Sequence, residues 1–126
     1  MEEVNGSSKD QSYEFERSDI VERLRIKVEA KEVAGVAELR ELRTAAVKHL
    51  PVFMKTLKQT GYELQNHEIL LCILIKVGFR PSEIAILMSM TPQNITNLRA
   101  RLNKKMFHAD KGARDFDEKI VNLTSS

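Results

Sequence analysis

Apolar residues recur at helical spacing along most of the chain, and this pattern predicts a series of amphipathic helices. Ile20, Leu24 and Val28 stand four residues apart after Ser18, which is a good N-cap residue. The segment 36–50 repeats the pattern and places these residues on one face: Val36, Leu39, Leu42, Ala46 and Leu50. No alternation of strand and helix patterns is present, so we expect an all-α fold.

Residues 13–62 are expected to form an N-terminal helical segment, preceded by a polar, disordered tail at 1–12. Within this segment, Pro51 either kinks the chain or starts a new helix, which Gly61 closes. The many charged residues of the segment fit two interpretations. They form either the solvated face of a helix bundle or a hairpin that dimerises or relays a signal.

Residues 63–124 are expected to form a four-helix domain. An apolar helix capped by Gln65 or Asn66 runs to Val77, and a short helix follows from Pro81. Thr91 and Pro92 together specify the start of the longer third helix. After a polar loop, the fourth helix covers 115–123 and offers Phe116, Ile120 and Leu123 for packing.

The third helix of this domain combines an apolar stripe with side chains suited to nucleic acid. Ile95, Leu98 and Leu102 form the stripe that packs inward. Amides and small side chains on the other side are candidates to read base edges: Gln93, Thr96, Asn97 and Ala100. Four cations are candidates to contact phosphates: Arg99, Arg101, Lys104 and Lys105. A short helix, a sharp turn and such a helix indicate a DNA-binding helix-turn-helix.

The charge distribution supports this interpretation more than the net charge of +2 does. No acidic residue occurs between Ile84 and Ala109, whereas four basic residues do. The apolar run around Cys72 is too short for a bilayer, and a single cysteine fits a reducing, cytoplasmic setting. The three histidines lack metal-ligand spacing and no nucleophile motif or phosphate loop is present, so we expect no metal, no cofactor and no enzyme activity.

The segment 64–107 resembles the LuxR/GerE-type helix-turn-helix domain of bacterial transcription regulators. The residues that carry the resemblance include Glu83-Ile84-Ala85, the Thr91 cap, Ile95, Arg99, Leu102 and Lys104-Lys105. The tail FDEKI is similar to the fourth helix of that family, and the combination resembles a branch found at the C-termini of sensor-regulators. Family members usually carry glycine in the turn where this chain has Ser89, and Ser or Thr where it has Arg80.

The resemblance implies base contacts from Thr96, Asn97, Ala100 and Gln93, and phosphate contacts from Arg99, Arg101 and Lys104. It implies sequence-specific binding of double-stranded DNA in transcriptional regulation, by a homodimer that acts alone or behind a sensor domain. Two alternatives remain open. One is a helical protein-interaction module with a vestigial helix-turn-helix, and the other is a sigma-factor-like promoter module that works with RNA polymerase. No direct membrane contact is expected from this chain.

Overall fold

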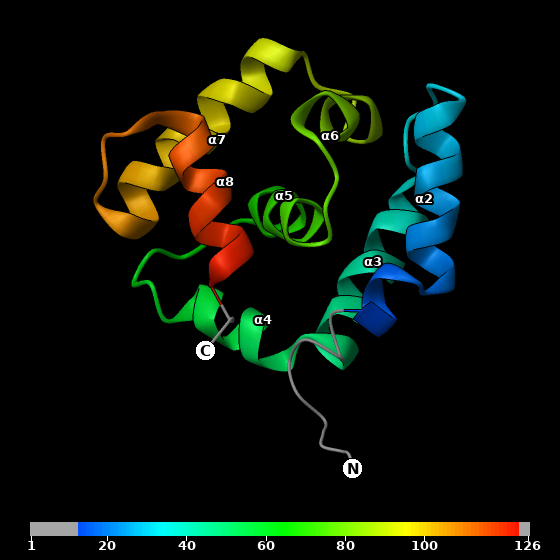
Figure 1. The fold of residues 1–126 in the computed structure, drawn as a ribbon, viewed down its shortest axis with the longest axis horizontal. Helices are drawn as coiled ribbons and strands as arrows, with labels where there is room; N and C mark the ends of the chain where they lie inside the picture. The colour runs from blue at the N-terminus through cyan, green and yellow to red at the C-terminus, as the bar shows by residue number, and fades with distance from the viewer. Residues whose placement is uncertain (1–12, 124–126) are drawn as a thin grey trace.

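The computed structural model describes residues 13–123, and every regular element within them is an α-helix. This confirms the predicted all-α class. A helical turn at 13–16 precedes seven helices (Figure 1): α2 (Asp19–Glu29), α3 (Val36–His49), α4 (Pro51–Lys58), α5 (Asn66–Lys76), α6 (Pro81–Leu87), α7 (Pro92–Phe107) and α8 (Gly112–Asn122). The predicted tail at 1–12 lies outside the described residues.

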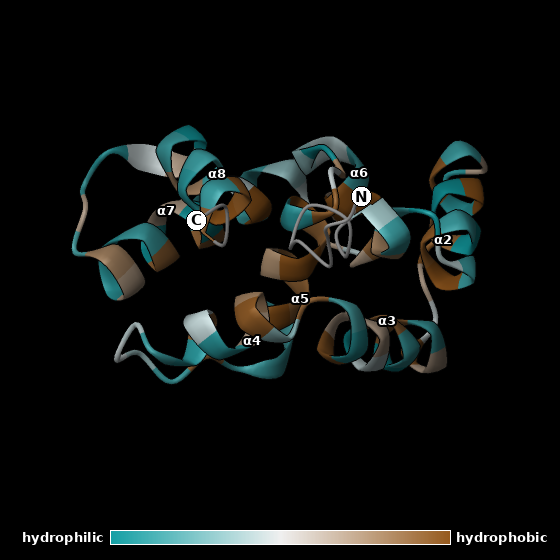
Figure 2. Cartoon of the chain, turned by 60° about the horizontal axis from the view of Figure 1, so that its bottom comes forward, coloured by the Kyte–Doolittle hydropathy of each residue, from teal (hydrophilic) through white to brown (hydrophobic). Residues whose placement is uncertain are grey.

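Helix α5 lies at the centre of the fold because its sequence is apolar on almost every side. Every residue from Glu68 to Ile75 is buried, and the helix is hydrophobic over most of its length in Figure 2. It contacts α3, α6 and α8, which surround it in Figure 1. A helix without a polar face is stable only when its neighbours cover it, so α5 holds the other helices in place.

The N-terminal helices pack against the C-terminal ones through apolar and polar contacts. The Arg25 guanidinium lies 4.5 Å from the centre of the Phe79 ring and donates to the Val77 carbonyl at 3.3 Å. The Ala34 amide donates to the Leu87 carbonyl, which ties the α2–α3 loop to the end of α6. One hydrophobic core therefore runs through both predicted segments, 13–62 and 63–124.

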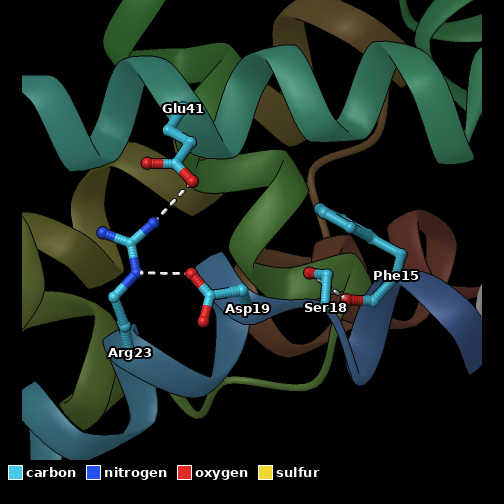
Figure 3. A network of polar contacts seen from close by, with 5 residues as sticks. All are labelled: Phe15, Ser18, Asp19, Arg23 and Glu41. Atoms are coloured by element: carbon cyan, nitrogen blue, oxygen red, sulfur yellow. Dashed lines mark hydrogen bonds and ion pairs between the residues drawn. The ribbon is translucent and has the colours of Figure 1, made fainter.

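An exposed ion network joins α2 to α3 (Figure 3). Arg23 donates to Asp19 one turn earlier at 2.9 Å and to Glu41 of α3 at 2.5 Å. Ser18 occupies the N-cap position of α2, as predicted, but its hydroxyl donates to the Phe15 carbonyl at 2.7 Å. Ser18 thus connects α2 to the preceding helical turn. Because the ion network is open to water, it adds little to the stability of the fold.

Most predicted helix boundaries are confirmed by their capping contacts. The Thr91 hydroxyl accepts from the Asn94 amide at 3.0 Å and starts α7 at Pro92. Glu68 starts α5 by accepting from the Gln65 amide, and Glu83 accepts from the Arg80 amide at the start of α6. These contacts satisfy backbone donors that have no partner within a helix.

Three local predictions were wrong. Helix α8 begins at Gly112 rather than at 115, so the preceding loop is shorter. Helix α4 ends at Lys58, and Gly61 lies beyond it with a φ of +88°. Val36 was placed on the apolar face of its helix but is 76% exposed, because the first turn of α3 extends past the core.

The turn between α6 and α7 contains Ser89 at a φ of +56°, the left-handed region that favours glycine. Replacing Ser89 with glycine should relieve this strain and raise the free energy of unfolding by roughly 0.5–1 kcal/mol, measured by urea denaturation. The matched control is Ser82→Gly in the first turn of α6, which should not raise the same free energy, because its backbone is helical and glycine adds only flexibility there. Equal effects of the two substitutions would contradict the assignment of strain to the turn.

Candidate nucleic-acid interface

Helix α7 has one buried face that anchors it to its neighbours. Ile95, Leu98, Leu102 and Met106 are all buried, and α7 contacts both α6 and α8. The predicted inward stripe of Ile95, Leu98 and Leu102 is therefore confirmed. Because these residues recur every three or four positions, packing fixes the rotation of α7 about its axis. The opposite face must then point to solvent.

The solvent face of α7 carries a stripe of two amides and two cations, Gln93, Asn97, Arg101 and Lys104, hereafter the α7 stripe. Their spacing of four, four and three residues places them on one side of the helix, and all four are exposed. The Gln93 side-chain amide donates to the Asn97 side-chain oxygen at 3.0 Å. The two amides thus orient each other at the N-terminal half, and the cations lie towards the C-terminal half.

The other predicted site residues flank the α7 stripe. Thr96 and Lys105 are exposed, so both are accessible to a ligand. Ala100 is partly buried and presents only a small apolar surface beside Asn97. The structure thus brings the predicted base-reading residues and three of the four predicted cations onto the accessible side of a single helix.

Arg99 is the exception among the predicted cations. Its side chain is 8% exposed and pairs with Asp117 of α8 through two bonds, from Nε at 2.9 Å and from Nη2 at 2.5 Å. Such a bidentate pair satisfies the guanidinium and fixes the distance between two helices. The prediction that Arg99 is free to contact phosphate is therefore corrected. Arg99 holds α7 against α8.

A second polar contact between α7 and α8 involves the buried residue Asn103. Its side-chain amide donates to the Gly112 carbonyl at 3.1 Å and to Asp115 at 3.0 Å. Asp115 also accepts from Lys119, and hydrogen bonds from Lys119 and then Asn103 lower the pKa of the Asp115 carboxyl. Asp115 thus packs α8 against α7 and lies in the first turn of α8, where the helix dipole favours an anion.

Arg101 of the α7 stripe acts electrostatically on Tyr62 in the loop before α5. The Tyr62 hydroxyl donates to the buried Glu68 carboxylate at 3.2 Å. Removal from water, followed by the charge of Glu68, raises the pKa of Tyr62, whereas the positive charge of Arg101 acts in the opposite direction. The loop therefore lies within electrostatic reach of Arg101, beside the candidate interface.

Acidic residues near the α7 stripe are few and exposed. Lys104 lies 3.6 Å from Asp110, but the two side chains are 62% and 86% exposed. Salt and water weaken such a pair strongly, so Lys104 exchanges it for another anion at little cost. Since the segment 84–109 contains no acid, the accessible side of α7 is a cationic surface.

Comparisons with protein families, curated proteins and solved structures return no match for this chain. Over residues 13–123, no cluster of three or more metal-ligating side chains occurs. In the same residues, no helix is both long and apolar enough to cross a bilayer.

The position of Arg99 in the sequence carries one signal of its structural role, which the assignment to phosphate did not use. Arg99 stands four residues after Ile95 and three before Leu102, which places it at the edge of the buried stripe. An arginine at such a position needs a buried acceptor. Its partner Asp117 is distant in sequence, so only the packing of α8 on α7 identifies it.

Proposed function

We propose that this chain binds double-stranded DNA sequence-specifically through α7 and acts as a transcriptional regulator or as the output domain of a sensor-regulator. The α7 stripe is the observation that carries the proposal. It joins amides that can pair with adenine to cations that can contact phosphate, on a helix whose rotation is fixed by packing. Gln93, Asn97, Thr96 and Ala100 read bases, and Arg101, Lys104 and Lys105 contact phosphates.

The arrangement of α6 and α7 supports this assignment. The two helices contact each other across the turn at 88–91, and α5 and α8 brace them from behind. A reading helix needs such a rigid support, because base edges are recognised only from a reproducible position. The resemblance of 64–107 to the LuxR/GerE-type domain also supports the proposal, and this support comes from the sequence alone.

Two copies of the chain would bind paired half-sites in this proposal. One short helix contacts little DNA, and specific interfaces require more buried surface than one small module supplies. A homodimer doubles that surface and converts two weak contacts into one strong one. A sensor domain or RNA polymerase is the further partner that would connect DNA binding to a signal.

DNA binding should weaken steeply with salt. In each copy of the chain, neutralising three phosphates by Arg101, Lys104 and Lys105 predicts a slope of about −2.7 for log affinity against log salt, or about a fortyfold loss between 50 and 200 mM. A fluorescence-anisotropy titration of a labelled duplex measures this slope. Circular dichroism at each salt concentration controls for folding. A flat salt response would contradict the proposal.

One observation favours an alternative function, that of a protein-interaction module. Ile26, Val33 and Val36 are more than half exposed and lie in or beside the loop between α2 and α3. If the chain acted only through these exposed residues, charge reversal on α7 would leave its protein interactions unchanged. Measuring both the oligomeric state and the DNA affinity of one α7 variant therefore separates protein interaction from DNA binding.

A further inference from the structure

A groove at the corner of α3 and α4 plays no part in the proposed DNA interface. It has a volume of about 640 Å³, and its lining residues come from α3, α4, the loop before α5 and the first turn of α5. Three buried apolar side chains, Met54, Leu57 and Ile69, belong to its lining. This size lies within the range typical of small-molecule sites, roughly 300–1,000 Å³.

Cations dominate the charged lining of the groove. Arg43, Lys55 and Lys58 line it, against the single carboxylate of Glu63. Within residues 13–123, no carboxylate forms an ion pair with any of these three cations. Arg43 donates to the side-chain oxygen of Asn66, which is a neutral acceptor. The cations of the groove thus retain charge that an anion can neutralise.

An exposed valine extends the apolar lining to the protein surface. Val47 of α3 is 55% exposed and lines the groove together with Tyr62 and Leu64, which are partly buried. A ligand that covered this wall would remove apolar surface from water, which favours binding. The groove therefore combines an apolar lining with cationic side chains.

We propose that the groove binds a small amphipathic carboxylate, whose apolar chain packs on Met54, Leu57 and Val47. Its carboxylate is held by charge-assisted hydrogen bonds from Arg43, Lys55 or Lys58. Charge complementarity selects an anion over a neutral or cationic ligand, and the volume selects a small molecule. This inference is independent of DNA binding.

The proposal is tested by titrating the full chain with decanoate, at decanoate concentrations below those at which it forms micelles. Two-dimensional amide NMR spectra are recorded at each step of the titration. Saturable shifts should appear in groove residues with a Kd below about 1 mM. Val47→Glu should weaken binding at least about tenfold, because it replaces an apolar contact of the ligand chain with a charged side chain that binding would have to remove from water. The matched control is Val52→Glu on α4, equally exposed at 56% and not in the groove lining. It should bind decanoate normally.

The role of the head-group charge is tested with decyltrimethylammonium, whose alkyl chain is one carbon longer than that of decanoate and whose charge is opposite. It should bind at least about tenfold more weakly than decanoate. Equal binding of the two compounds, equal effects of the two valine substitutions, or no saturable shift would overturn the proposal. If decanoate fails to bind and the chain forms a dimer that Val47→Glu dissociates, the groove belongs to a second copy of the chain instead.

Discussion

Replacing Asp117 with alanine should lower the free energy of unfolding by about 3 kcal/mol, because it leaves the Arg99 guanidinium buried without its counter-ion. The Arg99 side chain is 8% exposed, so water cannot replace both lost bonds. The pair also joins α7 to α8, and its loss should loosen the face on which the proposed interface is built. Urea denaturation followed by circular dichroism measures the change.

Asp110→Ala is the matched control for this prediction. It removes a carboxylate from another cation of α7, Lys104, but both partners are largely exposed. The expected change is less than about 1 kcal/mol. A double variant, Arg99→Leu with Asp117→Leu, should recover much of the stability lost in Asp117→Ala, because it removes both charges and retains apolar volume. Comparable losses for Asp110→Ala and Asp117→Ala would show that the buried pair has no special role.

Reversing two charges of the α7 stripe should abolish DNA binding in the usual concentration range. Arg101→Glu with Lys104→Glu removes two phosphate contacts and introduces two repulsive charges, so the Kd should rise at least about a hundredfold. Both side chains are exposed, and the fold should therefore persist. Anisotropy titration with duplex DNA measures the affinity, and thermal denaturation checks the fold.

The matched control reverses two exposed charges on α3, Arg40→Glu with Lys48→Glu. Each double variant changes the net charge from +2 to −2, since two cations become two anions. The control should change the Kd by less than about fivefold, because distant charges are screened at physiological salt. An equal loss in both variants would assign binding to overall charge rather than to α7. Arg99 is unsuitable for this test, since reversing its charge would also break the pair with Asp117.

The helices and the ends of several of them could be predicted from local sequence. Thr91 followed by Pro92 specifies the start of α7 because a hydroxyl acceptor and a preset φ act within one turn. The resemblance places glycine where this chain has Ser89, and the φ of +56° at Ser89 lies in the left-handed region that favours glycine. By contrast, the start of α8 was misplaced, since Gly112 begins that helix with no side-chain cap.

The sequence predicted which face of the helix forms the candidate site. It did not predict the role of every residue on that helix. The period of the apolar stripe placed Gln93, Asn97, Arg101 and Lys104 outside correctly, because an α-helix has a fixed rotation per residue. Whether a cation at the edge of that stripe faces solvent depends on the neighbouring helix. Arg99 was assigned to phosphate because its partner is distant in sequence.

The sequence by itself determined the all-helical class, the accessible side of α7 and its lack of acidic residues, since these depend on periodicity and composition. Only the tertiary structure decided that Arg99 is sequestered by Asp117, that the N-terminal helices share one core with the C-terminal ones, and that three cations surround a groove between α3 and α4. The physical reason is the range of the interactions. Capping and helix periodicity act within a few residues, whereas side chains far apart in sequence meet only after the apolar faces pack.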